Sequence, residues 1–328
     1  VYPCYAYRDS RTKDVIGRVH EIVPFEELYE RTGIQFQPFN TIYQLYCDLL
    51  AGRLDGVTDF LMIPEYLMYR LTGNKSHEYT NATTGGFVNA KDRTCDLEIL
   101  RKLGLPENLF GDLSMPGTVT GEYQGIKAVL CATHDTGSAV EGLPMPDDAM
   151  FLSSGTWSLL GIKLKEPVTT KESMEANFTN EGGPGYIRYL KNIMGLWIIQ
   201  NIQKLLGISF GEMVELAESS RYDRIFDVNK PCFMEPFGMR ENILKELNED
   251  ELSDADLINS IYRSLAYSYG LAVKELEKVT GLKPKDLYIG GGGAKNMYLN
   301  ELTAQFTGKN VVALPIEATA IGNLKIQI

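Results

Sequence analysis

Val129-Leu130-Cys131-Ala132-Thr133-His134-Asp135-Thr136-Gly137 begins as an apolar run and ends in an acid between a His and a Thr. The apolar residues from Ile126 to Ala132 predict a buried strand. Ligands of α/β sheets collect at the carboxyl ends of strands, and Asp135 stands at such an end. The small residues after Asp135 predict the start of a helix, so its carboxylate is placed to meet a ligand hydroxyl. A lone Asp after a strand is more often a helix N-cap, and both interpretations stay open at this point.

A second motif is Phe151-Leu152-Ser153-Ser154-Gly155-Thr156-Trp157-Ser158-Leu159-Leu160, in which two apolar segments flank small polar residues. This pattern predicts two strands joined by a tight turn, whose backbone N–H groups and hydroxyls can bind phosphate oxygens. A plain hairpin turn is the simpler alternative. An acid at a strand end, followed by a phosphate-binding turn, indicates phosphoryl transfer to a hydroxyl.

Composition limits the classes of partner. The chain has 328 residues, of which 44% are hydrophobic, and this supports a packed core. At about 150 residues per domain, that length predicts two domains. The net charge of -11 argues against nucleic acid or an anionic membrane surface as a partner. A nucleotide remains possible, because a local group of backbone donors can hold phosphate in an acidic protein.

Cysteine and histidine usage argues against a metal site, and we expect no metal-ligating residues. The residues are Cys4, Cys47, Cys95, Cys131, Cys232, His20, His77 and His134. Scattered, reduced cysteines predict a cytoplasmic protein. No stretch approaches the roughly 18 consecutive apolar residues of a membrane span, and we expect no signal peptide. The chain begins with Val1 rather than Met, so we expect a piece of a longer protein.

Short helices and loops are predicted between residues 1 and 125. Pro24 precedes one helix that Gly33 ends, and Asn40 or Thr41 caps another that ends at Gly52. Two further helices are predicted over residues 64–73 and 96–104. The apolar stripes of the first three helices are predicted to be core, and they contain Phe25, Leu28, Tyr29, Tyr43, Leu45, Tyr46, Leu49, Leu50, Tyr66, Leu67, Tyr69 and Leu71.

Residues 141–148 are rich in Gly, Pro and Asp and predict a domain boundary, which gives domains 1–143 and 144–328. Strands are then expected at 149–153 and 157–164, followed by a loop over 177–185. A helix is expected from about residue 191 to Gly207. Asn192 and Gln200 would lie one or two turns apart on it and could face the same ligand, although solvated side chains are an equal expectation.

The last third predicts a strand, a glycine turn, a helix and a second strand. A long helix after Ser253 is expected to end at Gly281. A strand at 286–289 then leads through Gly290-Gly291-Gly292-Gly293 to a helix at 297–306 and a strand at 310–314, which is a βαβ unit. Four glycines exceed what a turn needs, which favours a nucleotide approaching the backbone. Their spacing matches neither a dinucleotide-binding fingerprint nor a P-loop.

Six further stretches, distributed over the whole chain, can be matched to a known family together with the motifs described above. They are Tyr7-Arg8-Asp9-Ser10-Arg11-Thr12, Pro38-Phe39-Asn40-Thr41, Tyr79-Thr80-Asn81-Ala82-Thr83, Asn180-Glu181-Gly182-Gly183, Lys191-Asn192-Ile193-Met194-Gly195-Leu196-Trp197 and Glu317-Ala318-Thr319. Together with His134-Asp135-Thr136, the Ser-Gly-Thr turn and the glycine turn, they resemble the rhamnulokinase branch of the FGGY family of carbohydrate kinases.

The resemblance implies an α/β fold with two actin-like, ribonuclease H-like domains that flank a cleft, the first of them incomplete in this chain. It implies ATP and Mg²⁺ as cofactors and transfer of the γ-phosphate to the 1-hydroxyl of L-rhamnulose. The expected partners are this small-molecule sugar and ATP, with no nucleic acid or membrane. The expected oligomeric state is a monomer or homodimer.

The resemblance also implies roles for individual residues. Asp135 would be the general base. The sugar would contact His134, Asp135, Thr136 and Asn192. The nucleotide would contact Gly155, Thr156, Gln200, Gly291, Gly292, Gly293 and Asn296.

Members of this family begin with a strand-turn-strand element that carries an acidic residue and cradles phosphate and metal. That element and a Gly-containing sugar contact would precede Val1. We therefore expect the natural protein to be an active kinase of this family, and a polypeptide that lacks these parts to be inactive and prone to aggregation. Three alternatives remain: an L-fuculose or D-xylulose kinase of the same family, a non-catalytic sugar- or nucleotide-binding fragment, and a hydrolase. Gly207-Ile208-Ser209-Phe210-Gly211 would nominate Ser209 as a hydrolase nucleophile, but it follows a predicted helix rather than a strand.

Overall fold

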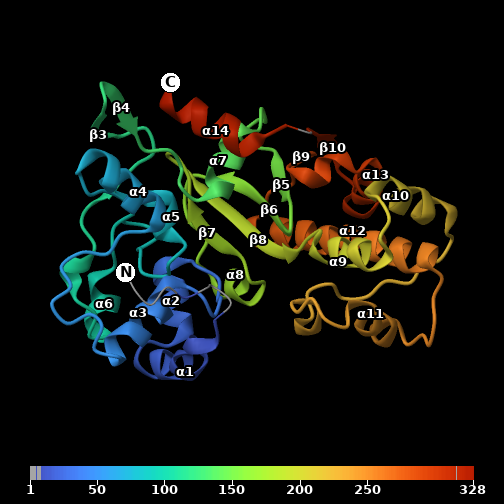
Figure 1. Cartoon of the computed structure of the whole chain (residues 1–328), viewed down its shortest axis with the longest axis horizontal. Coiled ribbons are helices and arrows are strands. Elements are labelled where there is room, and N and C mark those ends of the chain that lie inside the picture. Colours follow the sequence, from blue (N-terminus) through green and yellow to red (C-terminus); the bar gives the residue numbers. More distant parts are fainter. Residues whose placement is uncertain (1–4, 6–8, 315) are drawn as a thin grey trace. The chain divides into compact units, whose positions relative to one another are not determined.

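A computed structural model describes residue 5, residues 9–314 and residues 316–328 (Figure 1). Tyr7 and Arg8 of the first matched stretch, and Cys4, lie outside the described residues. The chain forms two compact units, each assembled from separate segments. Unit 1 comprises Val1–Glu141, Lys163–Leu190 and Thr319–Ile328, and unit 2 comprises Gly142–Ile162 and Lys191–Ala318. The predicted domain boundary after residue 143 stays a prediction.

Helices build most of the first part of unit 1, as the sequence predicts. They are η1 (Ser10–Thr12), α1 (Lys13–Ile22), α2 (Phe25–Thr32), α3 (Thr41–Leu50), α4 (Ile63–Thr72), α5 (Tyr79–Thr83), α6 (Leu97–Lys102) and η2 (Glu107–Leu109). Helix α2 lies between Pro24 and Gly33, and Asp96 caps α6 by accepting a hydrogen bond from the N–H of Ile99. These bounds confirm the predicted start and stop signals.

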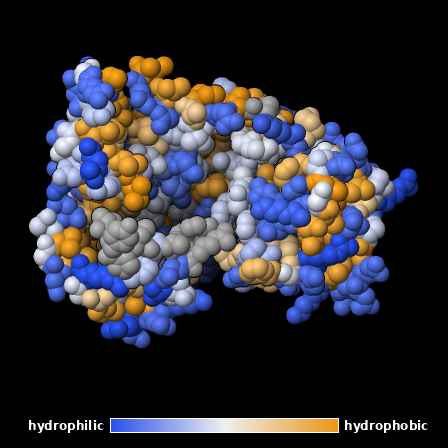
Figure 2. All heavy atoms as spheres, viewed as in Figure 1, coloured by the Kyte–Doolittle hydropathy of each residue, from blue (hydrophilic) through white to orange (hydrophobic). Residues whose placement is uncertain are grey.

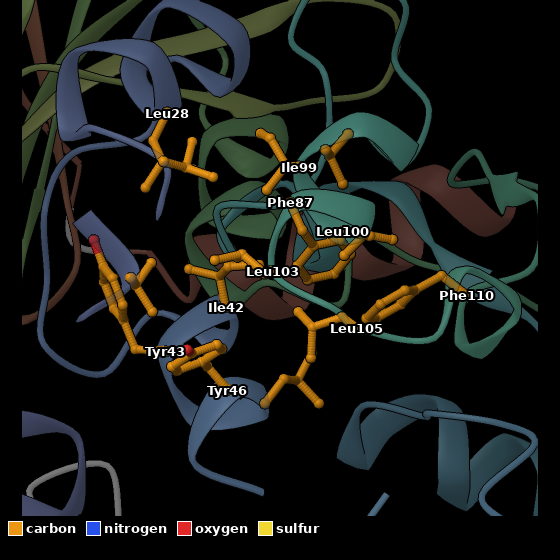
Figure 3. Close-up of a cluster of buried hydrophobic side chains, with 14 of the residues drawn as sticks. Leu28, Ile42, Tyr43, Tyr46, Phe87, Ile99, Leu100, Leu103, Leu105 and Phe110 are labelled. Atoms are coloured by element: carbon orange, nitrogen blue, oxygen red, sulfur yellow. The ribbon is translucent and has the colours of Figure 1, made fainter. Parts of the chain in front are cut away.

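A cluster of buried apolar side chains holds these helices together. Figure 3 shows residues from α2, α3 and α6 meeting the segments around residues 87 and 105–110. The labelled members are Leu28, Ile42, Tyr43, Tyr46, Phe87, Ile99, Leu100, Leu103, Leu105 and Phe110. Burying one such side chain contributes about 1.5–3 kcal/mol, so this cluster is a main source of stability for unit 1.

Helix α4 contradicts the prediction of a core stripe. Ile63, Leu67 and Leu71 are 65%, 58% and 48% exposed, whereas Glu65 is the buried residue of the helix. The carboxylate of Glu65 accepts hydrogen bonds from the backbone N–H groups of Met62 and Glu78, which draws the polar side of α4 inward. Figure 2 shows hydrophobic residues among hydrophilic ones on the visible face of the molecule.

The strand predicted over residues 126–132 is shorter than expected and is not buried. Strand β3 (Val119–Tyr123) pairs antiparallel with β4 (Ile126–Val129), and Ile126 is 72% exposed. Within the described part of the chain, this pair forms a two-stranded sheet by itself, and the end of α4 approaches it, because the amide of Asn74 donates to the carbonyl of Thr120. A second small sheet pairs β1 (His77–Glu78) with β2 (Leu113–Ser114) in parallel.

Within the predicted loop over residues 177–185, residues 179–182 form a strand instead. Unit 1 continues with α7 (Asp135–Gly142), α8 (Lys171–Glu175), β7 (Thr179–Gly182), the start of β8 (Ile187–Met194) and most of α14 (Ala318–Gln327). All four residues of β7 are buried, although they are polar or small. The side chain of Asn180 shows how a polar residue can be buried here, because its hydrogen-bonding groups have partners. Its N–H₂ group donates to the carbonyls of Gly33 and Val168, and its oxygen accepts from the N–H of Val168.

Unit 2 contains the predicted βαβ unit. Its strands lie in the order β10-β9-β5-β6-β8. They include β5 (Met150–Ser154), β6 (Trp157–Leu164), β9 (Asp286–Gly290) and β10 (Asn310–Ala313). Strands β5 and β10 both run parallel to β9, whereas β6 runs antiparallel to β5. Helix α13 (Met297–Thr307) connects β9 to β10, which confirms the strand, glycine turn, helix and strand of the prediction.

The helix predicted from residue 191 was wrong in its first part. Residues 191–194 end strand β8, and helix α9 (Trp197–Leu206) begins only after Gly195. Its end at Gly207 is as predicted. The alternation of Ile187, Tyr189 and Ile193 is a strand pattern, which the apolar residues of α9 obscured when the two were read as one segment.

The remaining helices cover unit 2. They are α10 (Phe210–Ser219), η3 (Pro231–Phe233), α11 (Met239–Leu247), α12 (Asp254–Thr280) and η4 (Gly292–Lys295). Ser253 caps α12 and Gly281 ends it, as predicted. Ser209 caps α10 and exchanges hydrogen bonds with Glu212, so it is a helix cap and not a nucleophile after a strand. None of the helices in the described ranges is long and apolar enough to cross a membrane.

Candidate functional site

Asp135 is the exposed first residue of α7 in unit 1, where the sequence predicts a helix start. Its Oδ1 accepts a hydrogen bond from the N–H of Thr136 at 2.7 Å and lies 3.3 Å from the Thr136 hydroxyl. The described residues offer no hydrogen bond to Oδ2. The carboxylate is therefore anchored through one oxygen, and the other is available to a ligand hydroxyl.

The backbone that leads to Asp135 is fixed by a buried carboxylate that the sequence analysis missed. Glu78 is fully buried, and its Oε2 accepts hydrogen bonds from the N–H and the hydroxyl of Thr133. The two oxygens also accept from the N–H and the hydroxyl of Thr80, each within 2.7 Å. No local pattern could reveal this role, because Glu78 and Thr133 are 55 positions apart.

His134 lies against a buried ion pair. Its Nδ1 is 3.2 Å from Nη1 of Arg188, and the same Nη1 is 3.1 Å from Oε2 of Glu181. Arg188 is fully buried, and its Nε donates to the carbonyl of Gly182 at 2.8 Å. Burial lowers the pKa of His134, and the positive charge of Arg188 acts in the same direction, so the ring is neutral at pH 7.

Thr136 is buried beside Asp135, so its contribution to the site is a hydroxyl that faces the carboxylate. Unit 1 thus brings His134, Asp135 and Thr136 together, as expected for consecutive residues. Arg188 and Glu181 are additions that only strand pairing brings to this place.

In unit 2, the Ser-Gly-Thr turn connects β5 to β6, as predicted. The carbonyl of Gly155 accepts a hydrogen bond from the N–H of Leu196 at 2.8 Å, and that of Thr156 accepts from Trp197 at 3.3 Å. A Cβ atom at Gly195 would lie 2.6 Å from the carbonyl oxygen of Gly155, so only glycine permits this approach. The turn is therefore held against the N-terminus of α9, where a helix favours an anion.

Packing explains three of the four glycines between β9 and α13. A Cβ atom at Gly290 would lie 2.9 Å from Leu143, one at Gly291 would lie 2.7 Å from the carbonyl oxygen of Ser154, and one at Gly293 would overlap the Ser154 hydroxyl. Gly291 also has a φ of +84°, which favours glycine. A Cβ atom at Gly292 would meet no atom within 4 Å. Gly292 is thus the glycine whose absent side chain leaves open space.

Three other predicted contact residues lie on different elements. Asn192 is on β8 and Gln200 is on α9, so the predicted common helix face was wrong. Asn296 caps α13, because its Oδ1 accepts a hydrogen bond from the N–H of Leu299 at 2.9 Å. The side-chain oxygen of Asn296 therefore serves as the cap of this helix.

The described ranges contain no group of three His, Cys, Asp or Glu side chains that could hold a metal ion. Magnesium at a nucleotide site is usually held by phosphate oxygens, water and one or two carboxylates, so it needs no such group. The exposed carboxylate of Asp135 is of the kind that fits this mode of binding.

Comparison with known proteins assigns the chain to a family. Two family models match it: the N-terminal domain of the FGGY family of carbohydrate kinases over residues 1–134, and the C-terminal domain over residues 150–328. A rhamnulokinase from Oceanobacillus iheyensis is 41% identical over 341 aligned positions, which cover 98% of this chain and 73% of the relative. A rhamnulokinase from Bacillus subtilis is 38% identical and aligns with 98% of this chain and 70% of its own length.

Solved structures share the fold at low sequence identity. A ligand-bound xylulose kinase from Lactobacillus acidophilus has a TM-score of 0.81 at 16% identity, covering 98% of this chain and 69% of that one. Plasmodium falciparum glycerol kinase with ADP has a TM-score of 0.80 at 14% identity, covering 99% and 70%. These similarities confirm the predicted α/β fold of the actin-like type. On the strength of both domain matches and the rhamnulokinase relatives, the chain belongs to the FGGY family of carbohydrate kinases.

Proposed function

We propose that this chain is an ATP-dependent sugar kinase that transfers the γ-phosphate to the 1-hydroxyl of L-rhamnulose, with Asp135 as the general base. The observation that carries the proposal is the exposed carboxylate of Asp135, anchored through one oxygen at the start of α7. The substrate is inferred from relatives named rhamnulokinase, which align with almost the whole chain.

Asp135 would accept the proton of the attacking hydroxyl. A carboxylate is a weak base at neutral pH, but phosphoryl transfer passes through a loose transition state in which orienting the nucleophile matters most. Proton transfer then contributes about 10²–10⁴-fold, and the remainder comes from positioning and from charge stabilisation at the phosphates. The free Oδ2 of Asp135 is the atom suited to this task.

His134 and Thr136 would hold the sugar on either side of Asp135 in the sequence. His134 is partly exposed, with 27% of its side chain accessible, so a ligand can reach its ring. Thr136 is buried and would act mainly by fixing the Asp135 carboxylate. Asn192, on β8 of unit 2, remains a proposed sugar contact.

The nucleotide would bind to unit 2. The turn at Gly155 and Thr156 would meet its phosphates, and the open space beside Gly292 would take its nucleoside. Gln200, Gly291, Gly293 and Asn296 complete the proposed contacts, with Gly291 and Gly293 acting through the shape that they give the turn. When bound, Mg²⁺ would neutralise part of the charge on the phosphates.

Release of ADP from MgATP by the purified chain tests this proposal. The assay would compare L-rhamnulose, L-fuculose, D-xylulose and no sugar. The proposal predicts ADP release that depends on sugar and has its highest kcat/KM with L-rhamnulose. Preference for another ketose would overturn the proposed substrate, and an absence of sugar-dependent release would overturn the proposed activity of this chain. The cytoplasmic location and the monomeric or homodimeric state stay predictions.

A further inference from the structure

The two nitrogens of the His134 ring have different surroundings. Nδ1 faces Nη1 of Arg188 at 3.2 Å, within hydrogen-bond distance. Oε2 of Glu181 is farther from Nδ1, at 3.6 Å, and forms no hydrogen bond with it. Within the part of the chain that the structure describes, no residue forms a hydrogen bond with Nε2.

The chemistry of arginine determines which ring nitrogen of the neutral His134 carries the proton. A guanidinium group has only N–H donors and no acceptor. The contact between Nη1 and Nδ1 is therefore a hydrogen bond only when Nδ1 carries no proton. A neutral ring with a bare Nδ1 must carry its proton on Nε2.

Strand register brings Arg188 to this position. Residue 188 on β8 lies directly opposite residue 181 on β7, so Arg188 and Glu181 project from the same face of the strand pair. The guanidinium carbon lies 3.6 Å from the position that a Cβ atom would occupy at Gly137, on the first turn of α7. A slip of one residue would turn the Arg188 side chain to the opposite face.

Burial favours the neutral form of the His134 ring, and the charged groups around it act in both directions. Arg188 lowers the pKa of His134, whereas Glu181, Asp135 and Glu78 raise it, and burial is the largest influence and lowers it. Glu181 balances the charge of Arg188, which lets a full positive charge lie buried beside the imidazole.

We propose that Arg188 is a positioning residue that fixes His134 as the neutral Nε2–H tautomer, so that this ring presents a hydrogen-bond donor next to the acceptor Asp135. One sugar hydroxyl would then donate a hydrogen bond to Asp135, and a neighbouring hydroxyl would accept one from His134. The two side chains would thus select hydroxyls by whether they donate or accept. The identification of the ligand as a polyhydroxylated sugar rests on the function proposed above. The tautomer itself does not.

Nitrogen-15 NMR of the histidine side chains tests the tautomer without any activity assay. The chain has three histidines, and a His134→Gln variant assigns the His134 signals. At neutral pH, the unmodified protein should show His134 with Nδ1 unprotonated and Nε2 protonated. A proton on Nδ1 would overturn the proposal, whether or not the chain proves to be a kinase.

Two variants with opposite expected effects extend the test. In Arg188→Met, Nδ1 loses its hydrogen-bond donor, and Oε2 of Glu181 can accept a hydrogen bond from a protonated Nδ1, so the Nδ1–H form should appear and the His134 pKa should rise. In Glu181→Gln, the donor remains, so the tautomer should persist and the pKa should fall. The titration would run from about pH 8 to about pH 5. The signals of His20 and His77 report whether each variant is folded.

If Arg188→Met does not fold, Arg188→Lys replaces it. Lysine keeps the positive charge but lacks the planar fork that reaches Nδ1 and the Gly182 carbonyl together. We expect a mixture of tautomers in this variant. A folded Arg188 variant in which the tautomer and pKa of His134 are unchanged would overturn the positioning role.

Discussion

Oε2 of Glu78 accepts hydrogen bonds from both the N–H and the hydroxyl of Thr133, at 3.0 Å and 2.7 Å. The same carboxylate caps α5 through the N–H groups of Thr80 and Asn81. One buried group thus joins the start of α5 to the segment that precedes His134 and Asp135. The candidate base owes its position to a residue far from it in the sequence.

Replacing this carboxylate should cost stability. In Glu78→Gln, an amide N–H₂ replaces one oxygen and confronts N–H and O–H donors, which leaves buried groups without partners. We expect the free energy of unfolding in urea to fall by about 1–3 kcal/mol. Glu122→Gln, on the exposed part of β3, is the matched control and should change it by less than about 0.5 kcal/mol. Equal effects of the two substitutions would contradict this role of Glu78.

Glu65 should make stability depend on pH. Burial raises the pKa of Glu65 from 4.5 to about 7, even though two backbone N–H groups stabilise its ionised form. Between these pH values the unfolded chain binds fewer protons than the folded one, so the free energy of unfolding should fall as pH rises. The fall attributable to Glu65 is at most about 3 kcal/mol and is complete above its folded pKa.

Urea unfolding at several pH values between these limits measures the effect. In Glu65→Gln, the side chain no longer ionises, so the decrease between pH 4.5 and about 7 should be reduced. Glu122→Gln should keep the slope of the unmodified protein. If the slope of Glu65→Gln matches that of the control, Glu65 is not the titrating group.

Neighbouring glycines should respond differently to the same substitution. An alanine at Gly293 would place its Cβ 1.9 Å from the Ser154 hydroxyl, so Gly293→Ala should destabilise unit 2 by about 1–3 kcal/mol. At Gly292 the Cβ has open space, so Gly292→Ala should keep its stability within about 0.5 kcal/mol.

Nucleotide binding separates the two roles further. If the nucleoside occupies the space beside Gly292, the Gly292→Ala methyl group will compete with it, and calorimetry should show weaker ADP binding by a stably folded protein. An unchanged Kd for ADP in Gly292→Ala would contradict the proposed contact. Gly293→Ala serves as the structural comparison.

Local signals in the sequence predicted much of the fold. Helix α2 between Pro24 and Gly33, helix α12 after Ser253 and the turn between β9 and α13 all depend on residues that act on their immediate neighbours. The same is true of Asp135 at the start of α7. Capping and glycine conformation act within a few residues, so they can be recognised without knowing the tertiary structure.

The failures have a common physical cause, which is that pairing and burial depend on distant segments. The end of β8 was predicted as helix because it was read as one segment with α9, and β7, which pairs with the start of β8, was predicted as a loop. The stripe of Leu67 on α4 was predicted to be buried, yet the inward residue is Glu65, which needs the N–H of Glu78. Arg188 beside His134 could not be predicted, because their contact spans 54 positions.

A pair of aspartate variants tests whether Asp135 is the base of a sugar kinase. Asp135→Asn keeps the shape of the side chain but cannot accept the proton, whereas Asp148→Asn changes another exposed aspartate, which lies after α7. The measurement is kcat for ADP release from MgATP with saturating L-rhamnulose. We predict that kcat falls by at least about 10²-fold in Asp135→Asn and stays unchanged in Asp148→Asn. Sugar-dependent turnover that survives in Asp135→Asn at the level of Asp148→Asn would contradict the account.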